Sequence, residues 1–138
     1  MSASPTPRPA PVVTELGRPF WQACAEGRLV VQRCSDCDRL RHYPQERCPD
    51  CHSDGFTWAD LSGRGSVYSY TVTHRAFHPA WADRVPYVVA TIELDEGVRM
   101  VSELLDVPAS GPAIGQRVEV VFEALEGFGA VPLFRVVD

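Results

Sequence analysis

Two short stretches decide the fold of this 138-residue chain: Cys34-Ser35-Asp36-Cys37 and Cys48-Pro49-Asp50-Cys51. In each stretch two residues separate a pair of cysteines, and ten residues lie between the pairs. Thiolates spaced in this way at a tight turn converge on one ion, and the amides of the turn can donate to the sulfurs. Two such turns complete a tetrahedral shell, which suits zinc or, less often, iron. The stretches predict a zinc ribbon that holds one structural zinc ion per chain, with Cys34, Cys37, Cys48 and Cys51 as ligands.

The alternatives for these cysteines are a redox pair or four reduced cysteines in a core. A redox Cys-x-x-Cys of the thioredoxin type stands alone at the start of a helix, whereas this chain has two pairs in a loop-rich segment. A shell of four thiolates leaves no open coordination position, so the metal is expected to be structural. His42 and His52 are then expected to be solvated loop residues, and Cys24 a small buried hydrophobe.

The cysteine count and the lengths of the apolar runs predict the cellular compartment of the protein. The chain has five cysteines, and this odd number argues against a set of disulfides. The first thirteen residues carry four prolines and lack the apolar run of a signal peptide. No stretch approaches the roughly 20 apolar residues that span a bilayer. We therefore expect a cytoplasmic protein in a reducing compartment, with no membrane contact, and a disordered leader over residues 1–15.

A short helix is predicted over residues 16–28. Pro19 suits a first helical turn and Gly27 a helix end, while Phe20, Ala23 and Cys24 share one face with Trp21 beside it. Two turns of helix do not persist alone in water, so this helix must dock. Its surface could be the chain's own body or another protein.

The chain is predicted to be mainly β beyond the helix. Residues 29–60 form the zinc ribbon, with a lead-in strand at its start, and residues 61–138 form a small barrel. Five β-branched-rich runs separated by turn signals, with no room for a crossover helix, favour a five-stranded OB-like antiparallel barrel. An SH3-like barrel is the nearest rival, because periodicity does not separate the two. The five runs are Ser66–His74, Tyr87–Leu94, Val98–Leu105, Val118–Glu123 and Val131–Val137.

Composition and motifs argue against a catalytic site in this chain. All thirteen basic residues are arginine, which excludes a Schiff-base lysine and a lysine-bearing phosphate loop. Neither a Gly-x-Ser-x-Gly elbow nor a glycine-rich phosphate cradle is present, so we predict no catalytic residue. The net charge is −5, and residues 56–138 carry all of it. A zinc ribbon followed by a small β-barrel is also found in nucleic-acid machinery, so a nucleic-acid-binding zinc ribbon and OB module is the alternative function. Such binding requires a basic face, whereas the barrel region is acidic, so no nucleic-acid partner is expected.

The order of several motifs carries a family resemblance. The motifs are Pro19-Phe20-Trp21, Gly27-Arg28-Leu29, the two cysteine pairs with Tyr43-Pro44 between them, Ser62-Gly63-Arg64-Gly65, Pro86-Tyr87-Val88-Val89-Ala90, Glu96-Gly97-Val98 and Ile114-Gly115-Gln116-Arg117-Val118. From about Leu16 onward the chain resembles a domain-of-unknown-function family. Its small proteins have an N-terminal helix, a rubredoxin-like zinc ribbon and a C-terminal OB-fold.

The resemblance implies an accessory protein that is not an enzyme on its own. Such proteins associate with thiolase-fold enzymes that act on acyl-CoA: thiolases, hydroxymethylglutaryl-CoA synthase and the aldolases of steroid side-chain degradation. The chain would be a required subunit of an acyl-CoA lyase or acyltransferase complex in lipid or steroid metabolism. It would be hetero-oligomeric and could contact acyl-CoA in a shared channel. Aromatic side chains concentrate at such interfaces, and the predicted partner contacts are Phe20, Trp21, Phe77 and Trp81.

Overall fold

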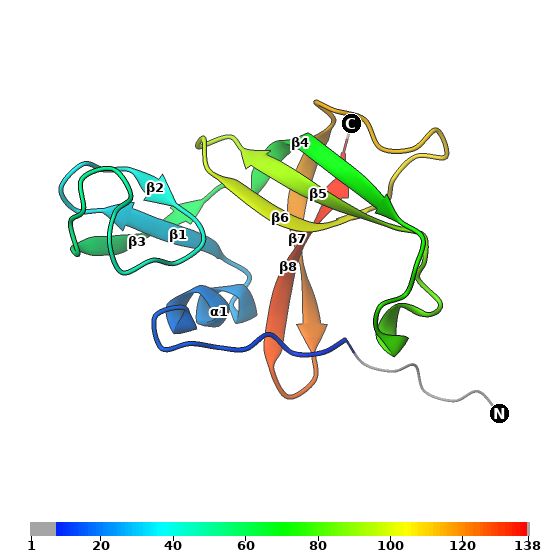
Figure 1. Ribbon diagram of the computed structural model, residues 1–138, viewed down its shortest axis with the longest axis horizontal. Helices are drawn as coiled ribbons and strands as arrows, with labels where there is room; N and C mark the ends of the chain where they lie inside the picture. Colours follow the sequence, from blue (N-terminus) through cyan, green and yellow to red (C-terminus); the bar gives the residue numbers. More distant parts are fainter. Residues whose placement is uncertain (1–7, 138) are drawn as a thin grey trace.

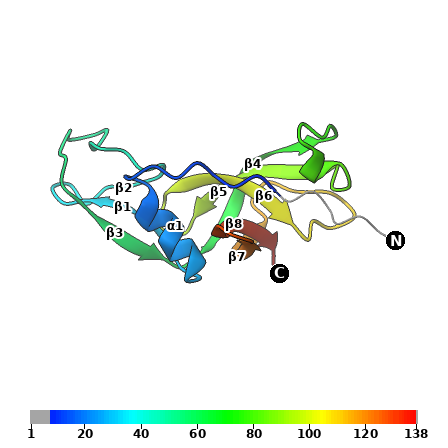
Figure 2. The same cartoon turned by 90° about the horizontal axis from the view of Figure 1, so that it is seen from below.

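The computed structural model describes residues 8–137, which form a short helix, a three-stranded sheet and a closed barrel (Figure 1). Residues 1–7 of the expected disordered leader lie outside the described residues. Residues 8–15 are described, and they run across the barrel towards the helix (Figure 2).

Helix α1 spans Arg18–Ala25, inside the predicted range. Phe20, Ala23 and Cys24 are buried, as their spacing predicts. The helix packs against β1 and β8 of its own chain, so the intramolecular alternative for its docking is what the structure shows. After the helix, Gly27 has a φ of +77°, which lets the chain turn into the ribbon.

The ribbon is an antiparallel sheet of three strands in the order β2-β1-β3. Its central strand β1 (Leu29–Cys34) is the predicted lead-in strand, and β2 (Leu40–Arg41) lies on one side of it. The strand β3 (Phe56–Leu61) lies on the other side and was not predicted. Its sequence does not alternate cleanly between apolar and polar residues, so pairing with β1 determines its conformation.

The barrel consists of five strands at the five predicted places. Its closed order is β4-β5-β6-β8-β7, so the last strand lies between the third and the fourth. This order is that of an OB-fold and separates it from the SH3-like alternative. One junction departs from the antiparallel expectation, because β6 and β8 run parallel over two residue pairs. The strands are β4 (Arg64–Thr73), β5 (Tyr87–Leu94), β6 (Arg99–Leu105), β7 (Arg117–Leu125) and β8 (Gly129–Val136).

One hydrophobic core joins the helix, the ribbon and the barrel. Along β5 every second side chain points inward, from Val88 to Leu94, as the period of a half-buried strand requires. The same cluster continues into the helix and the ribbon through Phe20, Cys24, Leu29 and Val31. The three parts therefore bury their apolar surface together and form one structural unit.

Candidate metal centre and partner surface

The four predicted ligands meet at one point. Their sulfur atoms all lie within 4.8 Å of one another, and the Cys34–Cys51 and Cys37–Cys48 sulfur pairs are each 3.5 Å apart. Zinc bonded to four thiolates at about 2.3 Å places the sulfurs about 3.8 Å apart. The cluster therefore has the size and the donor set of a tetrahedral metal site, and the other described residues form no comparable group.

The two cysteine turns have the same backbone geometry. The amide of Asp38 donates to the carbonyl of Cys34, and the amide of His52 donates to the carbonyl of Cys48, both at 3.0 Å. Asp38 and His52 each have a φ of 64°, in the left-handed region. Each turn thus folds back directly after its second cysteine, which directs both sulfurs of the pair to one side.

The turn amides also set the charge of the sulfurs. Backbone N–H groups of Cys37 and Asp36 lower the pKa of the Cys34 thiol. The amide of Cys51 is the main cause that lowers the pKa of Cys48 to about 6. The amide of Arg39 acts in the same direction on Cys37, but the neighbouring thiols and desolvation outweigh it and raise that pKa to about 12. Once Cys34 and Cys48 are ionised, their negative charge disfavours ionisation of the other two thiols. A bound cation is therefore needed to hold all four as thiolates.

A buried polar network supports the loop between the two cysteine pairs, and the sequence analysis did not predict it. Arg41 is 4% exposed and donates through Nε to Oε1 of the fully buried Gln32 at 2.8 Å. The same oxygen accepts from the amide of Gln45, and Arg41 also donates to the carbonyl of Gln45. The guanidinium lies 5.3 Å from the centre of the Phe56 ring. The only available signal was Gln32, which directly follows the apolar run Leu29–Val31 in the strand.

One of the two histidines near the site is not solvated, contrary to the expectation. His42 is half-buried between Phe20 and Tyr43, with ring centres 5.1 Å and 4.1 Å away. Burial lowers the pKa of its imidazole to about 4. His52 is exposed, as expected. His42 therefore contributes to packing between the helix and the ribbon.

The four aromatic residues predicted as partner contacts differ in exposure. Phe20 is 4% exposed and lies in the core. Trp21 is half-buried, with its ring edge-on to Phe20 and 5.5 Å from Phe128. Phe77 and Trp81 lie in the connection between β4 and β5, which contains the 3₁₀ turn η1 (Pro79–Trp81). Trp81 is half-buried, whereas Phe77 is 74% exposed. Phe77 is therefore the member of the set that is available to another molecule.

A cleft rich in arginine lies between the ribbon and the turn that joins β5 to β6. Its volume is about 900 Å³. Ion pairs hold two of its arginines, Arg39 to Asp50 and Arg99 to Glu93. Asp38 and Glu96 also line it, so positive charge exceeds negative charge only slightly. The arginines of the cleft are Arg33, Arg39, Arg41 and Arg99.

Family models match both parts of the chain. The model described as the ChsH2 rubredoxin-like zinc ribbon domain covers residues 21–57, and the model described as the ChsH2 C-terminal OB-fold domain covers residues 58–123. The chain belongs to this family of ChsH2-type zinc ribbon and OB-fold proteins.

Individual relatives carry three kinds of name. A probable enoyl-CoA hydratase alpha subunit of Thermomonospora curvata is 38% identical over 93% of this chain, which spans only 40% of that relative's length. A DUF35 domain-containing scaffold protein of Methanocaldococcus jannaschii is 36% identical over 73% of this chain and 72% of its own. The benzoylsuccinyl-CoA thiolase subunit BbsA of Thauera aromatica is 30% identical over 75% of this chain and 72% of its own.

A solved structure agrees with the fold at the level of the whole chain. A chain of the Ltp2-ChsH2(DUF35) aldolase superposes with a TM-score of 0.83 at 36% identity, over 92% of this chain and 98% of that one.

Helix α1 is far too short to cross a membrane, and the described residues contain no membrane-spanning helix.

Proposed function

We propose that this chain is a non-catalytic accessory subunit that binds and supports a thiolase-fold acyl-CoA enzyme. The observation that carries the proposal is the near-complete match to a chain of the Ltp2-ChsH2(DUF35) aldolase. The scaffold and thiolase-subunit names of two relatives support it. The hydratase relative extends well beyond this chain, so the hydratase activity in its name is not transferred. The partner would be a thiolase, a synthase of the hydroxymethylglutaryl-CoA type or a steroid side-chain aldolase, in a hetero-oligomer in the cytoplasm.

The roles of the polar side chains support a subunit without its own chemistry. Ser102 donates its hydroxyl to the carbonyl of Pro132, and Ser53 accepts from the amide of Gly55. Nδ1 of His78 accepts from the amide of Ala80 and caps the turn η1. These hydroxyl and imidazole groups serve the backbone, and the zinc that we assign to the four cysteines would have no open position for a substrate.

The partner surface that we propose is centred on Phe77. An exposed aromatic ring beside Arg75, whose guanidinium lies 5.2 Å from its centre, has the composition typical of interface anchors. Trp81 and Trp21 would contribute at the rim, and Phe20 would act by holding the helix in place.

We assign direct contact with the acyl-CoA to the arginine-lined cleft, where the exposed Arg33 is not one of the two arginines held by ion pairs. Arginine binds phosphate through two parallel hydrogen bonds, and the phosphates of CoA are the anions that the proposed partner handles. The nucleic-acid alternative is not favoured, since the relatives carry names of scaffolds and acyl-CoA enzyme subunits and the barrel region is acidic.

Co-purification with a thiolase-fold enzyme encoded beside this gene tests the proposal. We expect a stable complex, no acyl-CoA turnover by this chain alone, and higher activity or solubility of the partner in its presence. Phe77→Ala should weaken the complex by about 2 kcal/mol without changing the melting temperature. Ile114→Ala is the matched control, because Ile114 is a comparably exposed apolar side chain. Turnover by this chain alone that a point substitution abolishes would overturn the proposal.

A further inference from the structure

The beginning of the described chain lies along a groove on the barrel surface and forms part of its wall. Trp21 of the helix and Trp81 of the turn η1 line it, together with residues of β6 and β8. Pro9 and Pro11 also line this space of about 300 Å³. Figure 2 shows the N-terminal segment running across this side of the molecule. A stretch of chain without regular structure thus shares one groove with two tryptophan rings.

Arg8 anchors the segment in the groove. Its Nη2 donates to Oε1 of Glu103 at 3.2 Å, and its Nε lies 2.8 Å from Oε2 of Glu123. Its guanidinium also lies 5.0 Å from the centre of the Trp81 ring. The side chains of Arg8 and Glu103 are only 12% and 10% exposed. Ion pairs shielded from water to this degree are screened by salt much less than surface pairs are.

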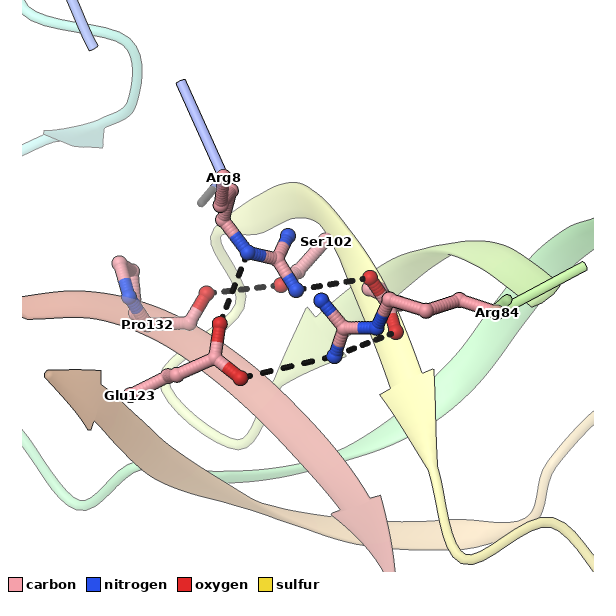
Figure 3. Close-up of polar contacts among 6 residues, drawn as sticks. Arg8, Arg84, Ser102, Glu123 and Pro132 are labelled. Atoms are coloured by element: carbon pink, nitrogen blue, oxygen red, sulfur yellow. Dashed lines mark hydrogen bonds and ion pairs between the residues drawn. The ribbon is translucent and has the colours of Figure 1, made fainter. Parts of the chain in front are cut away.

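The same two carboxylates also hold the aromatic connection. Nη2 of Arg84 lies 3.5 Å from Glu123 and 3.8 Å from Glu103, so two arginines and two glutamates alternate around one centre. Figure 3 shows Arg8 and Arg84 approaching Glu123 from different sides. Arg84 follows η1 by three residues. The cluster therefore ties the N-terminal segment and the connection that carries Phe77 to the same two strands.

The floor of the groove is the least regular junction of the barrel. The parallel ladder between β6 and β8 covers only Leu104 and Leu105 on the β6 side. Pro132 of β8 has no N–H to donate, and its carbonyl accepts instead from the hydroxyl of Ser102 at 2.8 Å (Figure 3). The N-terminal segment lines the same groove as the β6 and β8 residues next to this short ladder.

The sequence of the segment suits a bound extended conformation. Proline fixes φ near −65°, and a residue that precedes proline is biased towards extended backbone. In Arg8-Pro9-Ala10-Pro11 every residue is restricted by one of these effects. A segment that is already extended loses little entropy on binding, which is why aromatic grooves recognise proline-rich peptides.

We propose that this groove is a peptide-binding site for an extended arginine–proline segment, and that residues 8–11 of the same chain are its ligand. The two tryptophans and the two prolines line the same space, and the two glutamates bind the arginine. Occupation of the groove fixes Trp81, and through Arg84 the whole connection between β4 and β5.

Full-length Arg8→Gln tests the site, with Arg18→Gln as the matched control because Arg18 is an exposed arginine at the start of the helix. The readout is the indole ¹H–¹⁵N signal of Trp81, assigned with Trp81→Phe, together with acrylamide quenching of tryptophan fluorescence. Arg8→Gln should shift the Trp81 signal and increase quenching, whereas Arg18→Gln should do neither.

A synthetic peptide with the sequence of residues 8–13 then tests binding in trans. The peptide is added to the Arg8→Gln protein at millimolar concentration, which matches the effective concentration of a segment held by a short linker. It should return the Trp81 signal to its wild-type position, and the effect should saturate. The same peptide with glutamine in place of arginine should leave the signal unchanged. An unchanged Trp81 signal in Arg8→Gln, equal effects of the two peptides, or no effect of either peptide would overturn the proposal.

Discussion

At the scale of single residues, the four cysteine sulfurs should determine metal content. Cys37→Ser removes one ligand of the four, so elemental analysis should find about one zinc per chain in the wild type and a large loss in the variant. Cys24→Ala is the matched control: Cys24 is buried but lies outside the sulfur cluster, so its metal content should stay at the wild-type value. A wild-type protein that folds cooperatively without metal would contradict the assignment.

His42 should make stability depend on pH. Burial lowers its pKa to about 4 in the folded protein, whereas an unfolded histidine titrates near 6.5. The unfolded state therefore binds the proton first, and the stabilising contribution, fully present above about pH 6.5, is lost as the pH falls towards 4. Between pH 7.5 and 5.5 the free energy of unfolding should fall by about 1 kcal/mol from this group.

The contribution of His42 is isolated by comparing variants in chemical denaturation. His42→Phe should keep the ring packing and lose this part of the pH dependence, while His74→Gln, at an exposed histidine, should keep it. We expect loss of metal at low pH to affect all three proteins alike, because neither histidine belongs to the sulfur cluster. An identical pH dependence in the wild type and His42→Phe would show that burial of His42 has no such effect.

At the scale of elements, helix α1 depends on the docking of its aromatic side chains. Trp21 packs against Phe20 and Phe128, so Trp21→Ala should lower the free energy of unfolding by about 2 kcal/mol, below the cost of a fully buried tryptophan. Phe77→Ala, at an exposed ring, should leave stability nearly unchanged. If Trp21→Ala instead preserved the melting temperature and weakened only the partner complex, Trp21 would be an interface residue.

The link between ribbon and barrel imposes a second requirement, at Gly63. This residue has a φ of +79°, and a Cβ there would lie 2.4 Å from Cγ1 of Val120. Gly97 also has a positive φ, but its Cβ would meet nothing within 4 Å. Gly97→Ala should therefore cost about 1 kcal/mol from backbone strain alone, and Gly63→Ala about 1–3 kcal/mol more from overpacking. Equal losses in denaturant unfolding would contradict the packing argument.

Local patterns predicted the elements of this fold well, and contacts between distant residues could not be predicted. The strand at Tyr87–Leu94 was predicted to the residue because it is a run rich in β-branched residues that a turn signal follows. The cysteine spacing predicted that the four sulfurs meet, because two such turns suffice to bring them together. The ion pair between Arg8 and Glu103 joins residues 95 positions apart, and no local pattern records such a partner. The burial of His42 likewise depends on the helix that packs over it.

At the scale of the whole molecule, the metal site and the barrel should be thermodynamically coupled. Phe20 of the helix and Leu29 and Val31 of the ribbon belong to the same hydrophobic cluster as Ile92 of the barrel. Metal binding supplies much of the folding free energy of a small ribbon, so loss of the metal should unfold the ribbon. The barrel core then loses its contacts with the ribbon residues. Chelation should therefore lower the melting temperature of the barrel as well as that of the ribbon.

Two probes at separate places distinguish coupled from independent unfolding. Trp58 on β3 reports on the ribbon, and amide hydrogen exchange along β5 reports on the barrel. With metal bound, both probes should follow a single transition, as small cooperative proteins do. After chelation, protection along β5 should fall even though these strands contain no metal ligand, because their core has lost the packing of Leu29 and Val31. Unchanged protection along β5 after complete removal of the metal would show that the barrel folds independently of the ribbon.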